Sequence, residues 1–282
     1  MMDTVKRLDT YKIKLYLRIT FKDIVTVFTS KDKTTRSTRA SCIKNRIYAF
    51  LPKTKDYNGR LRVNEYHVNY KSLWELLFLQ DEIFRNEEYR FTENIQNPLI
   101  IDCGSNIGMS ILYFKTRHSS ARIIGFEPNR KIYNILLKNL HENELTDVVV
   151  NNLALAGHNG HIEFFESDTE TLDNSIVTDE NKKKVRVECV KLSEYIHEKV
   201  NLLKMDVEGA EEDVIEDLIN TKKIRLVDKI FMEYHLLPDR RLGLEGMIKS
   251  LKKHGFKVNV RSNDPVHVQT PKFYQYLISA ER

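Results

Sequence analysis

The sequence contains 282 residues, enough for one large α/β domain with an appendage or for two small domains. Hydrophobic residues make up 41% and charged residues 30%, which is ordinary for a soluble globular protein with a normal core. The 45 Lys and Arg residues against 40 Asp and Glu residues give a formal net charge of +5. This charge permits contact with acidic glycans, nucleic acid or anionic lipid, but demonstrates none of them.

The cysteines and the hydropathy pattern bear on the compartment. Cys42, Cys103 and Cys189 lie far apart, without metal-ligand spacing, which fits a reducing compartment and argues against a disulfide framework. The N-terminus lacks a secretory signal pattern, and no eighteen apolar residues run together. We therefore expect a cytoplasmic protein.

The N-terminal 41 residues are basic and interleave charged with apolar positions at helical spacing. This spacing predicts an amphipathic helix whose basic face is either solvated or rests weakly on a membrane surface or partner. Residues 31–39 are polar and predict a loose loop. The positions that define the helix are Lys6, Arg7, Leu8, Tyr11, Lys12, Lys14, Leu15, Arg18, Ile19 and Lys22.

The next residues predict a hairpin and a helix. Residues 46–51 and 61–68, separated by Asn58-Gly59, are typical of two paired strands. Ser72 and Glu75 have the spacing of a capping box, which starts a helix running through Phe84. We therefore treat residues 1–96 as a helix/hairpin/helix extension whose part in substrate binding is open.

From residue 97 to residue 282, strands alternate with helices. This alternation predicts a parallel sheet covered by helices on both faces, with ligands bound at the C-terminal strand ends. A hairpin-like excursion over 161–190 interrupts it, and two further strands close the chain. The expected strands are 99–101, 121–126, 148–153, 200–205, 229–233, 256–261 and 273–279; the expected helices are 107–117, 130–141, 210–220 and 244–254.

The run Asp102–Gly108 lies where the first of these strands turns into a helix. Gly104 allows a tight turn, Gly108 allows close packing, and the helix start offers unpaired N–H groups to a ligand carboxylate. A glycine turn with a capping Asp is the simpler interpretation. Asn106 replaces the second glycine of the dinucleotide-binding pattern, which disfavours a nicotinamide or flavin enzyme. Ser105 completes the candidate cofactor-binding loop.

The ends of the second and third predicted strands carry further candidate residues. Glu127, next to Pro128, ends the second strand, where an acid commonly pairs with ribose hydroxyls. Its alternative role is that of an acid favoured at a helix start. Residues 150–156 end the third strand, and Ala154 and Leu155 are small or apolar groups suited to flank an adenine ring.

Acidic residues and a histidine end the fourth and fifth strands. Helix capping accounts for Glu208 and Glu211 but less well for Asp206. Glu233 and His235 end the neighbouring strand, and a His beside a carboxylate can act as general base. Asp206, Glu233 and His235 are the candidate catalytic residues. The same three are alternatively ligands for a divalent cation, and the sequence does not decide this.

Together these residues resemble the FkbM-type methyltransferases. The resemblance covers roughly residues 82–235 in order and spacing, and the run K-M-D-V-E-G-A-E is its most specific part. The matching pieces are IIDCGSNIG (100–108), GFEPN (125–129), LALAG (153–157), LLKMDVEGAE (202–211) and FMEYH (231–235), preceded by Asp81–Phe84 and Tyr89.

The resemblance implies a class I methyltransferase fold, a Rossmann-like seven-stranded sheet whose last hairpin supplies an antiparallel strand. It also implies S-adenosylmethionine as cofactor and O-methylation of a hydroxyl, often on a sugar, polysaccharide or natural product. The loop positions Asp102, Gly104, Asn106 and Gly108, with Glu127, would hold the cofactor, and Asp206 would border the transferred methyl group.

Three alternatives stay open. An NAD-dependent oxidoreductase shares the fold and Glu127 but is opposed by Asn106. Nucleic-acid methylation is suggested by the basic N-terminal third, but the fourth strand lacks an N-P-P-Y run and no aromatic platform is visible. A non-catalytic binding protein of the same fold is opposed by the acids at positions 102, 127 and 206.

Overall fold

The computed structural model describes the chain except residues 1–16, 52–56, 92–94, 167–182, 238–240 and 263–273. The chain divides into two compact units, Met1–Glu88 and Tyr89–Arg282, whereas the sequence suggested a boundary after residue 96. Most of the basic N-terminal helix expected from the sequence lies outside the described residues. None of the described helices is both long enough and apolar enough to cross a bilayer.

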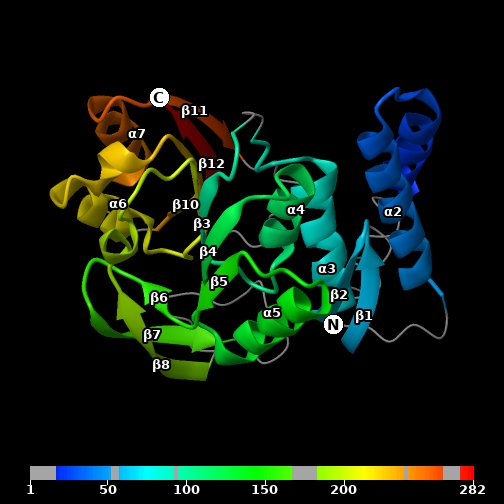
Figure 1. The fold of residues 1–282 in the computed structure, drawn as a ribbon, viewed down its shortest axis with the longest axis horizontal. Helices are drawn as coiled ribbons and strands as arrows, with labels where there is room; N and C mark the ends of the chain where they lie inside the picture. Colours follow the sequence, from blue (N-terminus) through cyan, green and yellow to red (C-terminus); the bar gives the residue numbers. More distant parts are fainter. Residues whose placement is uncertain (1–16, 52–56, 92–94, 167–182, 238–240, 263–273) are drawn as a thin grey trace, which may run out of the picture. The chain divides into compact units, whose positions relative to one another are not determined.

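The N-terminal unit combines helices with a hairpin (Figure 1). A helix over residues 17–29 precedes the first labelled helix. The remaining elements are α2 (Lys33–Ala49), β1 (Tyr57–Val63), β2 (Tyr66–Ser72), α3 (Leu73–Leu79) and the π-helical turn η1 (Gln80–Arg85). The first of the two hydrogen bonds of the predicted capping box is confirmed: Ser72 Oγ accepts from the Glu75 N–H at 3.4 Å.

Two predictions for this unit were wrong. The expected loop over 31–39 is mostly the start of α2, because Asp32 caps it by accepting from the Thr34 and Thr35 N–H groups. Residues 46–49 of the expected strand over 46–51 are the end of the same helix. Buried contacts of Arg46 with acidic side chains hold this segment helical against its β-forming composition.

The hairpin turn also lies elsewhere than predicted. The strand register pairs Val63 with Tyr66, so the turn is Asn64-Glu65 rather than Asn58-Gly59. Asn64 adopts the left-handed conformation that such a turn requires, with φ 52°. Its N–H donates to Ser41 Oγ at 2.9 Å, which ties the turn to α2. The contact that selects the turn is therefore tertiary.

The C-terminal unit contains a seven-stranded sheet of order β11-β12-β10-β9-β3-β4-β5. Only β12 runs antiparallel to its neighbours, so the predicted α/β class I methyltransferase architecture with a closing hairpin is confirmed. The strands are β3 (Leu99–Cys103), β4 (Arg122–Phe126), β5 (Val148–Asn151), β9 (Leu202–Met205), β10 (Lys229–Leu236), β11 (Lys257–Ser262) and β12 (Tyr274–Glu281).

Helices cover both faces of this sheet (Figure 1). One face carries α4 (Met109–Arg117) and α5 (Arg130–Glu142), and the other carries α6 (Glu211–Asn220) and α7 (Gly243–Lys253). The short turns η2 (Leu192–Tyr195) and η3 (Lys223–Leu226) precede β9 and β10. Because every residue of β3 and β9 is buried, these two central strands read as apolar runs in the sequence.

A small second sheet stands beside the main one. It is formed by β6 (Ala154–Leu155), β8 (Lys183–Val190) and β7 (Gly160–Glu166), in that order. The pairing of β7 with β8 is antiparallel and corresponds to the hairpin-like excursion expected from the sequence. This sheet supplies one wall of the pocket described below.

Candidate functional site

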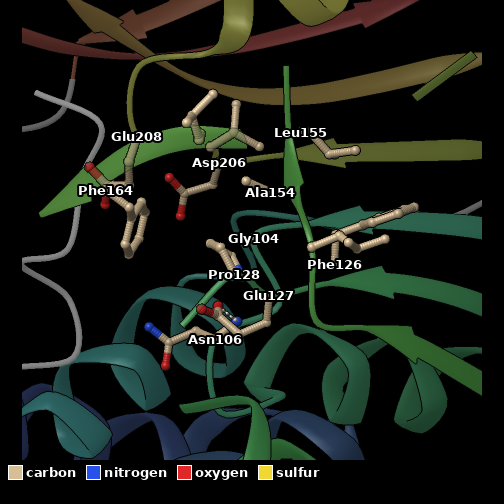
Figure 2. A pocket seen from close by; sticks show the side chains of 13 residues that line it. Gly104, Asn106, Phe126, Glu127, Pro128, Ala154, Leu155, Phe164, Asp206 and Glu208 are labelled. Carbon is tan, nitrogen blue, oxygen red and sulfur yellow. Dashed lines mark hydrogen bonds between the residues drawn. The ribbon is translucent and has the colours of Figure 1, made fainter. Parts of the chain in front are cut away.

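A pocket opens at the C-terminal ends of β3, β4 and β9, where ligands bind in doubly wound sheets. Its empty space is about 650 Å³, a figure that includes open solvent at the mouth. Figure 2 shows Phe164 and Glu208 on one side, Leu155 and Phe126 on the other, and Asp206 and Gly104 between them. The lining residues are Gly104, Asn106, Phe126, Glu127, Pro128, Leu153, Ala154, Leu155, Ile162, Phe164, Asp206, Val207 and Glu208.

The loop after β3 is shaped by residues in left-handed conformations. Gly104 has φ 83°, and a Cβ on it would lie 1.8 Å from the Asp206 carbonyl oxygen, so only glycine fits. Gly104 and Ser105 donate their N–H groups to the Phe126 carbonyl oxygen at 3.0 and 2.8 Å, which fixes the loop on β4. Asn106 has φ 47°, which asparagine tolerates, and Gly108 has φ 95° at the start of α4.

Glu127 is buried at the end of β4 and joins two loops. Its Oε2 accepts from the Asn106 N–H at 2.9 Å, and its Oε1 accepts from the Asn129 N–H at 2.8 Å. Burial raises the Glu127 pKa to about 7, although both hydrogen bonds oppose this shift. A carboxylate has about four lone-pair sites. Two acceptor positions therefore remain for hydroxyl groups of a ligand.

The apolar wall of the pocket comes from two sheets. Ala154 and Leu155, which the sequence predicted, are joined by Leu153 and Phe126. Ile162 and Phe164 on β7 also line the pocket, and the sequence analysis missed them. Their alternation places both on one face of a strand, but only the pairing of β7 with β8 beside β6 brings that face to the pocket.

Three predicted cofactor residues are absent from the pocket lining. Ser105 and Gly108 shape the loop instead, and Asp102 is completely buried. Asp102 Oδ2 accepts from Ser110 Oγ at 2.6 Å, and Asp102 Oδ1 lies 3.3 Å from Lys204 Nζ. Asp102 thus faces an ammonium group of the protein itself.

Lys204 is the most consequential residue that the sequence analysis missed. Its ammonium group is buried and donates to the Gly104 carbonyl oxygen at 2.6 Å. Burial disfavours the charged form, but Asp102 and Asp206 outweigh it and raise the Lys204 pKa above its ordinary value. The signal was a single Lys within the apolar strand L-L-K-M. Lys204 therefore ties the cofactor-loop turn to the strand that carries Asp206.

The carboxyl edge of β9 and β10 gathers two carboxylates and a histidine. Asp206 and Glu208 line the pocket, and His235 Nε2 lies 3.4 Å from Glu208 Oε2. His235 Nδ1 lies 2.9 Å from Glu211 Oε1, which also accepts the Gly209 N–H. Glu208 sits in the left-handed region with φ 51°, an unusual backbone for a long side chain that directs it to this group.

The residues of this group shift one another's pKa values. Burial opposes charge on His235, but Glu208 and Glu211 outweigh it and raise the His235 pKa well above its ordinary value. Burial and the neighbouring acids raise the Glu208 pKa, against the opposing effect of His235. Glu233 is only half-buried and contributes negative charge to both.

Of the three predicted catalytic residues, Asp206 and His235 thus lie close to Glu208, and the charge of Glu233 acts on the same group. Ligand atoms of Asp206, Glu208 and His235 lie within 4.8 Å of one another. Oxygen and imidazole ligands suit several divalent cations, so these are the described residues best able to hold one. The alternative metal set therefore exchanges Glu233 for Glu208.

Comparison with known proteins adds a family match. A model described as the methyltransferase FkbM domain matches residues 102–258, a segment that contains every pocket-lining residue. The chain is 28% identical to methyltransferase sdnD of Sordaria araneosa over 194 residues, 56% of this chain and 74% of that protein. It is 26% identical to methyltransferase 1 of Beauveria bassiana over 242 residues, 77% of this chain and 94% of that protein. TYW2 of M. jannaschii, solved in complex with AdoMet, aligns with a TM-score of 0.47 and 13% identity, over 82% of this chain and 90% of that one.

Proposed function

The chain belongs to the FkbM family of methyltransferases, and on this premise we propose that it transfers a methyl group from S-adenosylmethionine to a hydroxyl oxygen. The acceptor we propose is a sugar, a polysaccharide or another hydroxyl-bearing natural product. The observation that carries this proposal is the group Asp206, Glu208 and His235 beside the pocket, because a hydroxyl acceptor must lose a proton when it is methylated.

The pocket residues fit the cofactor. The free acceptor positions of Glu127 suit the two ribose hydroxyls, as acids at the end of this strand commonly do. The apolar side chains Leu153, Leu155 and Phe126 suit an adenine ring. The carboxylates of Asp206 and Glu208, at the other side of the pocket, suit a positively charged sulfonium.

The cofactor supplies a methyl group that is already activated on sulfur. The protein therefore has to align the acceptor, exclude water and receive one proton. His235 is held between Glu208 and Glu211, whose charges raise its pKa against the effect of burial, and this position suits it to orient Glu208. A carboxylate whose pKa is raised is a stronger base than an ordinary one, and Glu208 has this property.

We accordingly assign the hydroxyl proton to Glu208 and an orienting role to His235. Asp206 Oδ1 is buried and accepts no hydrogen bond from any residue that the structure describes, which suits it to receive a hydrogen bond from the acceptor. The sequence left the base open among Asp206, Glu233 and His235, and we propose instead that Glu208, the carboxylate next to His235, receives the proton.

Glu208→Gln tests the assignment. The variant should slow methyl transfer by about a hundred- to ten-thousand-fold, the usual contribution of a general base. Binding of S-adenosylhomocysteine, measured by calorimetry, should stay near the wild-type value because the adenosine side of the pocket is untouched. Glu216→Gln, an exposed acid on α6, is the matched control and should behave like wild type. Wild-type turnover in Glu208→Gln would remove this residue from the reaction.

The acceptor class is tested by transferring a radiolabelled methyl group to cell extracts and identifying the product. An O-methyl ether resists mild alkali, whereas a methyl ester is hydrolysed by it, so alkali-stable label on a non-nucleic-acid product is expected. Label that disappears on nuclease treatment would show a nucleic-acid acceptor and contradict the proposal. Binding of NAD rather than S-adenosylhomocysteine would contradict the cofactor assignment.

A further inference from the structure

The helix over residues 17–29 has its apolar face on the outside. Five large apolar side chains recur at i, i+4, i+7, i+8 and i+11, which places them on one helical face. All are exposed: Leu17 by 62%, Phe21 by 68%, Ile24 by 40%, Val25 by 45% and Phe28 by 84% of their surface. We call these five residues the apolar stripe.

The opposite face of the same helix is turned inward, with Asp23 buried among the half-buried residues Ile19 and Val27. Asp23 is completely buried, and its carboxylate pairs with Arg39 at 3.0 Å, Arg46 at 2.6 Å and Arg85 at 2.9 Å. A helix docked on a protein core normally turns its apolar face inward. Here the buried ion pairs of Asp23 hold its face of the helix inward, so the five residues of the stripe point outward.

The surroundings of the stripe are strongly basic. Residues 17–51 contain eight Lys and Arg residues and two Asp residues, a net charge of +6, which exceeds the formal charge of the whole chain. Arg18 and Lys22 flank the stripe on the same helix and are exposed. The other exposed basic residues of this segment are Lys31, Lys33, Arg36 and Lys44.

We propose that the apolar stripe docks on an anionic lipid bilayer, with its large apolar side chains in the boundary between headgroups and acyl chains. An exposed apolar face bordered by basic residues is the pattern of helices that lie in the membrane surface. Anionic headgroups supply the charge complementary to Arg18, Lys22 and their neighbours, at about 1 kcal/mol for each basic residue near the surface. This docking is independent of the proposed methyl transfer.

Vesicle flotation of the full chain tests the proposal. The protein should float with vesicles of phosphatidylcholine mixed with phosphatidylserine, and much less with phosphatidylcholine alone. Burying one Phe side chain is worth on the order of a tenfold change in partition or more, so Phe21→Ser with Phe28→Ser should reduce flotation on the order of a hundredfold. Arg18→Glu with Lys22→Glu should abolish the preference for anionic vesicles.

Matched variants separate the stripe from general surface effects. Val149→Ser removes an apolar side chain that is 62% exposed in the C-terminal unit, and Lys138→Glu with Lys184→Glu reverses exposed charges there. Both should float like wild type. Circular dichroism checks that each stripe variant is folded. If the double variant Phe21→Ser with Phe28→Ser does not fold, the single variant Phe21→Ser replaces it and should reduce flotation less.

Three results would overturn the proposal. Wild-type protein that fails to float with anionic vesicles shows that lipid is not the occupant. Concentration-dependent dimerisation that disappears in Phe21→Ser, with no vesicle binding, shows that a second copy covers the stripe. Equal flotation of wild type and the folded stripe variants would assign any vesicle binding to another surface.

Discussion

Removing the buried ammonium of Lys204 tests whether an ion pair organises the loop between β3 and the pocket. In Lys204→Met the carboxylate of Asp102 stays completely buried and keeps only the hydrogen bond from Ser110 Oγ. Breaking a buried pair by removing one partner costs about 3–5 kcal/mol, because the remaining charge is uncompensated. We expect a loss of this size in the free energy of unfolding, measured by urea denaturation followed by circular dichroism.

Lys115 provides a closely matched control. Its ammonium is equally buried and also donates to a backbone carbonyl, that of Ala121 at 2.6 Å. Its acidic partner Asp147 is 62% exposed, however, so water can solvate that carboxylate when the lysine is removed. Lys115→Met should therefore cost clearly less than Lys204→Met, about 1–3 kcal/mol for the unpaired carbonyl and lost hydrogen bonds.

The double variant Asp102→Asn with Lys204→Met identifies the cause. Because it removes both charges, it should be more stable than the sum of the two single losses predicts, by a coupling free energy of up to about 3 kcal/mol. Additive losses, or equal losses in Lys204→Met and Lys115→Met, would refute the reasoning, since the buried charge of Asp102 would then carry no special penalty.

Two further changes test the cofactor side of the pocket. Gly104→Ala should cost about 2–5 kcal/mol of stability, from the left-handed backbone and the clash with the Asp206 carbonyl oxygen, and should abolish S-adenosylhomocysteine binding. Gly255→Ala has a similar φ of 90° but open space around it, so only the smaller backbone cost should appear there; equal costs would exclude the clash. Burial raises the Glu127 pKa to about 7, so the folded state binds a proton more tightly than the unfolded state does. This proton stabilises the folded state by about 3 kcal/mol below about pH 4.5, and the stabilisation is lost as the pH rises through 7. Glu127→Gln should remove this fall in unfolding free energy between about pH 5 and about pH 8, and an unchanged pH slope would contradict the assignment.

Local patterns were sufficient for much of the C-terminal unit. The strands β3 and β9 are short apolar runs because both faces of a parallel sheet are covered, and Gly104 and Asn106 mark backbone conformations that few other residues tolerate. The β-α-β spacing then placed Glu127 and Asp206 at the same sheet edge, and both line the pocket. Patterns of this kind depend on residues close in the chain.

The errors arose where distant contacts decide the outcome. Residues 46–51 have strand-forming composition, but Arg46 pairs with acids far away in the chain and residues 46–49 are helical. The helix over residues 17–29 follows the same rule, because the ion pairs of the buried Asp23 with distant arginines decide which of its faces points inward. No local periodicity distinguishes an inward from an outward apolar face.

The sequence alone determined the alternating architecture, the cofactor loop and the position of the acids, because periodicity, glycine conformations and strand-end spacing are local properties. Only the tertiary structure decided which charges meet. It paired Asp102 with Lys204, placed Glu208 beside His235, and brought Ile162 and Phe164 to the pocket from a second sheet. The physical reason is that ion pairs and hydrogen bonds need their atoms within a few ångströms, and chain spacing does not fix such distances between residues far apart in the sequence.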